Sequence, residues 1–83
     1  MLYHYYIIAK SGLFDCNYYL LNYPDVRKAD MDPLWHFVKK GWKELRNPSS
    51  DFNTRAYLEE NPDVKNARIN PLSHYIKHNK NFI

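Results

Sequence analysis

Three histidines stand at one recurring position of a repeated phrase, and histidine is the side chain most often used for metal binding and proton transfer near neutral pH. They are His4, His36 and His74. A metal or catalytic site needs groups that converge, whereas equivalent positions of successive repeats point in parallel, and no HExxH or CxxC spacing supplies further ligands. We therefore expect a structural hydrogen-bonding or packing role for the histidines. We predict no catalytic residue, no metal site and no cofactor.

A second candidate is a group of aromatic rings beside positive charges near the middle of the chain. Exposed rings next to lysine or arginine can stack on sugars or on bases. The same rings can fill the seam between helical repeats, which we favour for the tryptophans, and the lysines can complement the dipole of a helix end. The candidate partner-binding or glycan-binding surface comprises Trp35, Trp42, Lys43, Arg46, Lys39 and Lys40.

Composition limits the classes of protein to which the chain can belong. Its 83 residues are typical of one small domain, and its net charge of +3 is below that of a dedicated nucleic-acid-binding protein. The one cysteine, Cys16, cannot form an intrachain disulfide, which favours a reducing compartment. The opening segment, MLYHYYIIAK, has no basic leader and is too short to span a bilayer. These features predict a cytoplasmic protein, or a cytoplasmic piece of one, without a membrane span.

The elements that must position these side chains come from an internal repeat. Residues 14–45 align with residues 52–83 without a gap, and eleven of the 32 aligned pairs are identical, including the phrase PDV in both copies. A repeat length near 40 residues is typical of stacked helical units. We expect one domain over residues 1–83, made of a partial repeat (1–13), a first repeat (14–51) and a truncated second repeat (52–83).

Each full repeat divides into three short helical pieces at capping residues and prolines. Asp15 and Asn53 are good N-caps, and each follows a phenylalanine that can pack on the tyrosine at the fourth helical position. A proline begins the second piece of each repeat, and another proline, which follows Asp32 or Asn70, begins the third piece. Proline is suited to the first helical position because no N–H group is needed there. Asn61 is expected to cap the second piece of the second repeat.

The third pieces carry the apolar stripes that must form the core. The first of them is expected to end at Gly41 in the left-handed conformation, with Asn79 as the counterpart in the second repeat. The partial repeat matches this third piece alone, and its apolar stripe is expected to be Leu2, Tyr5, Tyr6 and Ala9. No segment alternates in polarity as a strand does, so the sequence predicts an all-α domain.

The strings FDCNYYLLNYPDV and DPLWHFVKKGWKELRNPSS resemble a helical repeat that recurs in bacterial cell-surface polysaccharide proteins. In those proteins, which include rhamnan-synthesis-type proteins, the repeat is attached to glycosyltransferases, and its usual wording is close to FDxxYYLxxNPDV followed by DPLxHYLxxGWxEGRxPS. This chain departs from it at Tyr23, where asparagine is usual, and at Leu45, where glycine is usual. The resemblance covers nearly the whole chain and implies an associated module, but it transfers no active-site residue.

The resemblance and the residues together favour a non-catalytic helical interaction module in bacterial surface-polysaccharide synthesis, which docks an enzyme to its partners or holds a glycan. Such a chain is expected not to be an enzyme on its own, and to be a fragment of a glycosyltransferase or an accessory to one. A protein or a surface glycan is the expected partner, and the apolar ends of stacked repeats make self-association a further expected contact. The less favoured alternative is a small basic protein that binds nucleic acid or inhibits a nucleic-acid enzyme, with an affinity that falls steeply with salt.

Overall fold

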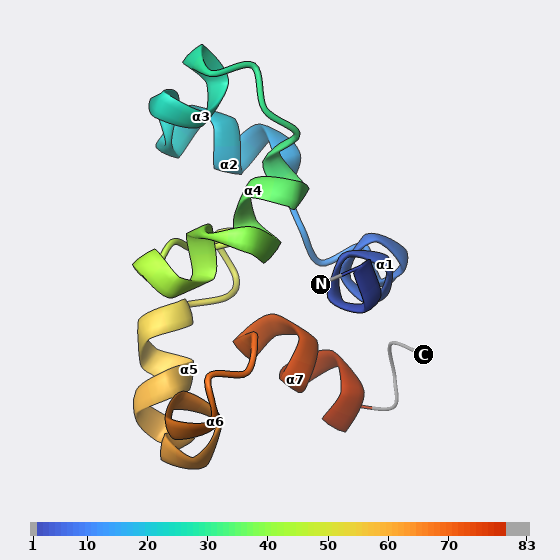
Figure 1. Ribbon diagram of the computed structural model, residues 1–83, viewed down its shortest axis with the longest axis vertical. Coiled ribbons are helices and arrows are strands. Elements are labelled where there is room, and N and C mark those ends of the chain that lie inside the picture. Colours follow the sequence, from blue (N-terminus) through green and yellow to red (C-terminus); the bar gives the residue numbers. More distant parts are fainter. Residues whose placement is uncertain (1, 80–83) are drawn as a thin grey trace.

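The two full repeats fold alike, each into three short helices in the same order (Figure 1). The structure is a computed structural model and describes residues 2–79. Repeat one forms α2 (Cys16–Asn22), α3 (Pro24–Lys28) and α4 (Pro33–Lys39), and repeat two forms α5 (Thr54–Glu60), α6 (Pro62–Ala67) and α7 (Pro71–His78). The partial repeat is α1 (Leu2–Ser11), and a 3₁₀ helix, η1 (Gly41–Glu44), follows α4. No strand is present within residues 2–79, so the prediction of an all-α domain built on tandem repeats is confirmed.

The first helix of each repeat begins as the sequence predicts. The side chains of Asp15 and Asn53 accept hydrogen bonds from the backbone N–H three residues ahead, at 3.0 and 2.9 Å. The phenylalanine ring before each cap lies 5.1 or 5.3 Å from the tyrosine ring at the fourth helical position. Both contacts lie within a few residues of the helix start, which is why the sequence alone predicts them.

The third helices are capped in the same way, whereas the second helices are not. Asp32 and Asn70 accept hydrogen bonds from backbone N–H groups two and three residues ahead, at 3.0 to 3.4 Å. The expectation that Asn61 caps α6 is wrong, because its side chain makes no such bond and instead donates to the carbonyl of Tyr57 at 2.8 Å. Asn61 therefore stabilises the end of α5, and Pro62 alone marks the start of α6.

The predicted left-handed helix ends at Gly41 and Asn79 are also wrong. Gly41 has no positive φ, and φ of Asn79 is −119°. Gly41 is needed for space, because a Cβ atom at this position would collide with the hydroxyl of Tyr19. The left-handed conformation occurs four residues later, at Leu45, with φ of 63°. This is the position at which the resembled repeat carries glycine.

Helix α1 packs against both α4 and α7 and closes the space between the two repeats (Figure 1). Its buried side chain is Ile8, which belongs to the same core as Phe37 of α4 and Leu72 of α7. Of the predicted stripe, Tyr5 is half-buried and packs against this core, but the prediction is wrong for Leu2 and Tyr6, which are 73% and 59% exposed, and for Ala9, which is exposed. The packing of α1 against α4 and α7 determines which of its faces is buried.

Leu58 of α5 and Val64 of α6 are buried elsewhere, but one hydrophobic core joins α1, repeat one and α7. Its buried members are Ile8, Tyr19, Val26, Leu34, Phe37, Val38, Trp42, Leu72 and Ile76. The radius of gyration is 12.0 Å, close to the value of about 12 Å expected for a single compact domain of this length. The longest helix within residues 2–79 has ten residues, and none of the helices there is long and apolar enough to cross a bilayer.

Candidate functional site

The repeated histidines of α4 and α7 each bond to the repeated tyrosine of the first helix in the same repeat. In repeat one, the hydroxyl of Tyr19 and Nδ1 of His36 are 2.8 Å apart, and both side chains are buried. In repeat two, Tyr57 and His74 make the same hydrogen bond at 2.7 Å, with both side chains half-buried. The expected structural hydrogen-bonding role is confirmed for these two histidines, because the bond joins the first helix of each repeat to the third.

His4 occupies the same repeat position but makes no hydrogen bond to a tyrosine hydroxyl, and its ring instead packs edge-on against that of Tyr3, with centroids 5.5 Å apart. Its Nδ1 is buried without a hydrogen-bond partner. Burial lowers the pKa of His4, and the positive charge of Lys77 on α7 adds to this effect. Burial is also the main cause of the lowered pKa of His36 and of His74. All three repeat histidines therefore favour the neutral form in the folded domain.

Acidification below about pH 6.5 should destabilise the domain for this reason. When the pKa of a histidine is lower in the folded state than in the unfolded state, the unfolded state binds more protons. The contribution of the neutral histidines to the stability of the fold is then fully present above their ordinary pKa of about 6.5. It is lost as the pH falls below that value. The melting temperature, measured by circular dichroism from about pH 7.5 to about pH 5, should fall across the lower part of this window.

Two histidine variants test which groups cause the fall. His36→Asn keeps a hydrogen-bond acceptor near the position of Nδ1 but removes the titrating group, so its melting temperature should vary less with pH. His74→Asn removes the equivalent half-buried histidine of repeat two, whose pKa is also lowered by burial, and should flatten the profile as well. A profile as steep in the His36 variant as in the unchanged chain would contradict the role given to His36.

The two tryptophans of the predicted surface lie in seams between helices. Trp42 is 8% exposed and belongs to the core, and its indole N–H donates to the carbonyl of Val38 at 3.1 Å. Trp35 is half-buried, and its ring centroid lies 5.9 Å from that of Tyr5 on α1. The interpretation that these rings fill seams agrees with their positions, and Trp42 presents little surface to a partner.

The four predicted cations differ in how available they are to a partner. The guanidinium of Arg46 makes two hydrogen bonds to Asp25, at 2.9 and 2.8 Å, and an ion pair of 3.0 Å with Glu44. Its positive charge is therefore already compensated within repeat one. Lys39 and Lys40 are exposed at the end of α4. Of the predicted surface, Trp42 and Arg46 are therefore engaged within the domain, whereas Lys39 and Lys40 are exposed.

The fourth cation, Lys43, lies on a groove that the structure reveals between the two repeats. This basic groove has a volume of about 480 Å³ and is lined by Trp42, Lys43, Leu45, Leu58, Lys65 and Arg68. The first three follow α4 in repeat one, and the last three come from α5, α6 and the residue after α6 in repeat two. Neither repeat can form the groove without the other.

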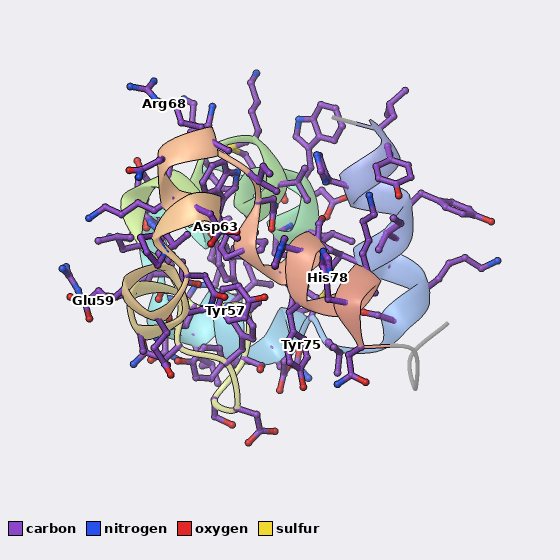
Figure 2. The ribbon with its side chains drawn as sticks, turned by 90° about the horizontal axis from the view of Figure 1, so that it is seen from below. Tyr57, Glu59, Asp63, Arg68, Tyr75 and His78 are labelled. Carbon is purple, nitrogen blue, oxygen red and sulfur yellow. The ribbon has the colours of Figure 1, made fainter. Side chains whose placement is uncertain are left out.

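Local backbone conformation positions the side chains around the groove. The 3₁₀ turn of η1 places Nζ of Lys43 5.8 Å from the ring centroid of Trp42. Leu45 and Arg68 both adopt the left-handed conformation, with φ of 63° and 56°, at the ends of η1 and α6. Figure 2 shows Arg68 projecting outward from the end of α6. The groove thus combines two buried apolar side chains, Trp42 and Leu58, which form its base, with three exposed cations, Lys43, Lys65 and Arg68.

The helices, the Tyr–His pairs and the basic groove together describe a small helical domain with a cationic hollow at the junction of its repeats. No family model, no curated protein and no solved structure matches this chain.

The sequence predicts two of the three lining residues that repeat one contributes to the groove, Trp42 and Lys43, and none of the three from repeat two. Trp42 and Lys43 were selected because a ring stands beside a cation in the chain. Lys65 and Arg68 lie more than 20 residues further on and have no aromatic neighbour in the sequence. The sequence does contain one signal of these residues. Lys65 and Arg68 are both cations, whereas Asp30 stands at the position of Arg68 in repeat one, so only repeat two carries a cation at both positions.

A second hollow, which we name the acidic groove, lies between the segment after α1 and repeat two. Its volume is about 540 Å³, and its lining includes Asp15, Asp51, Glu60, Asn53, Tyr57 and Tyr75. The rings of the two tyrosines are 6.1 Å apart (Figure 2). Asp15 and Asn53 are already used as helix caps, and Tyr57 is bonded to His74. The polar groups of this groove are therefore largely explained by the fold.

The remaining reactive groups do not assemble into a further site. Among residues 2–79, no three His, Cys, Asp or Glu side chains are placed to hold a metal ion together. Cys16 lies in the first turn of α2, where a helix dipole can lower the pKa of a thiol. Burial instead raises the pKa of Cys16, and the charges of Asp32 and Asp15 raise it further. The thiol is thus less reactive than an ordinary cysteine.

Proposed function

We propose that this chain is a non-catalytic helical docking module of bacterial cell-surface polysaccharide synthesis, acting as part of, or accessory to, a glycosyltransferase system. The likeness of both repeats to the polysaccharide-associated helical repeat supports the biological setting. The chemistry of the basic groove supports the docking role. Cys16, the one cysteine, is exposed and unpaired, which supports a reducing, cytoplasmic location.

The observation that carries the proposal is that the basic groove is built from both repeats. Its apolar base and its three cations come together only when η1 of repeat one stands against α5 and α6 of repeat two. A partner can bind this surface only when both repeats are folded against each other, as is expected for a docking module. The charges of Lys43, Lys65 and Arg68 are uncompensated, since none of them forms an ion pair with another residue in 2–79.

Affinity capture with a charge-reversed control tests the proposal. The tagged chain is exposed to an extract of bacteria that make a surface polysaccharide, and bound proteins are identified by mass spectrometry. Glycosyltransferases or other polysaccharide-synthesis proteins should be retained by the unchanged chain and lost with the Lys65→Glu/Arg68→Glu variant. Trp42 is not a suitable target, because it belongs to the core and its replacement would disturb the fold.

The matched control is Arg27→Glu/Lys28→Glu, which reverses two exposed charges on α3 of repeat one. Arg27 is the repeat equivalent of Lys65, so this variant changes the net charge equally without touching the groove. It should retain the same proteins. Retention of none of the polysaccharide-synthesis proteins, or their equal retention by both double variants, would contradict the proposed function.

A further inference from the structure

We infer that the basic groove binds an acidic peptide segment of a partner protein, with an aliphatic side chain on its base and carboxylates against its cations. The inference rests on the proposed docking function and names the chemistry of the partner. Three properties of the groove lead to it: the composition of its base, the donor-only character of its polar groups and the burial of its aromatic ring.

The base of the groove is apolar and belongs partly to the core. Leu58 and Trp42 are buried, and Leu45 is half-buried at the turn between them. A volume of about 480 Å³ lies within the range of sites that hold a ligand or several side chains. A leucine-like or isoleucine-like side chain would place its surface against these residues, in the way that apolar anchors of bound peptides fill hydrophobic grooves.

The polar side chains around the groove can only donate hydrogen bonds. Lysine and arginine have no acceptor, and the indole N–H of Trp42 is already bonded to Val38. Among residues 2–79, no acidic, hydroxyl or amide side chain lines the groove. A complementary ligand must therefore offer acceptors and negative charge, and carboxylates next to lysine and arginine meet both requirements.

Sugar and nucleic acid fit this lining less well. The hydroxyl groups of a sugar donate as well as accept, and no side chain of the groove can accept from them. Single-stranded nucleic acid gains affinity when bases stack on open aromatic faces. The one aromatic ring here is 8% exposed and has Nζ of Lys43 5.8 Å from its centroid. An acidic peptide with an aliphatic anchor uses all parts of the groove.

Selection of a random 12-residue peptide library displayed on phage against the purified chain tests this inference. We expect enriched peptides to contain at least two Asp or Glu residues next to Leu, Ile, Val or Met. A fluorescein-labelled copy of the most enriched peptide is then titrated by fluorescence anisotropy. Lys65→Glu/Arg68→Glu should weaken binding by about 50-fold, and Arg27→Glu/Lys28→Glu should change it by less than about threefold.

Four results would overturn the inference. The first two are a selection without enrichment and an enrichment of peptides that lack acidic residues. The third is competition by an oligogalacturonate or by a 12-nucleotide oligothymidylate that is as strong as competition by the peptide. The fourth is self-association of the chain that the Lys65→Glu/Arg68→Glu variant abolishes. The last would assign the groove to a second copy. Circular dichroism of every variant excludes unfolding as the cause of a loss. Because this assay uses the purified chain and defined probes, it can succeed or fail independently of the extract experiment, which alone decides the biological setting.

Discussion

Replacing Gly41 by alanine should lower the free energy of unfolding by about 3 kcal/mol. The added methyl group would collide with the hydroxyl of Tyr19, and it would also approach Nδ1 of His36. Overfilling a packed core costs about 1–3 kcal/mol, and breaking a buried hydrogen bond costs about 1–3 kcal/mol more. For a domain of this size, the melting temperature should fall by at least about 10 °C.

A double-mutant cycle identifies the cause of this loss. Tyr19→Phe removes the hydroxyl, so alanine at position 41 should cost at least about 1 kcal/mol less in that background. Gly12→Ala is a control of a different kind, since Gly12 has φ of 75° and nothing within 4 Å of an added Cβ. It should cost only about 1 kcal/mol, through backbone conformation. An equal cost for alanine at position 41 with and without the tyrosine hydroxyl would contradict the steric explanation.

The sequence predicted what neighbouring residues determine. The caps at Asp15, Asp32 and Asn70 act on N–H groups two or three residues away, and the aromatic contact before α2 spans one turn. Such interactions repeat wherever the phrase repeats, so the helix starts could be placed without coordinates. The all-α class followed from the same local signals.

The errors have their causes far along the chain. Gly41 is explained by Tyr19, 22 residues earlier, and not by the end of its own helix. Lys65 and Arg68 complete the basic groove from the other repeat. In each case the contacting residue comes from a distant part of the chain. Helical periodicity and motif spacing carry no information about such a contact.

The element that follows α4 makes the two repeats unequal. In repeat one, Arg46 binds the carboxylate of Asp25 and lies over the ring of Tyr23, at 4.8 Å from its centroid. Asp63, the equivalent of Asp25, forms no ion pair within residues 2–79. The phrase PDV thus begins a helix in both repeats. In repeat one its aspartate also binds Arg46 and so holds the turn of η1 in place. That turn carries Trp42 and Lys43, so the ion pair helps to hold one wall of the basic groove in place.

Replacing Ile8 by alanine should lower the free energy of unfolding by about 3 kcal/mol, because Ile8 is fully buried where α1 meets α4 and α7. A domain of 83 residues has a total stability of about 4–12 kcal/mol, so this loss would be a large part of it. Urea unfolding followed by tryptophan fluorescence and by circular dichroism measures the effect. Both signals should shift together, since one core includes Ile8 and the buried ring of Trp42.

Leu21→Ala is the matched control for the Ile8 variant. It removes an aliphatic side chain that is 74% exposed on α2 and should change the stability by no more than about 0.5 kcal/mol. If α1 were a separate appendage, Ile8→Ala would leave the fluorescence transition in place and alter only part of the circular dichroism signal. A shared shift instead requires that the partial repeat completes the core of both full repeats. The basic groove would then depend on α1 for its stability, although α1 supplies none of its lining.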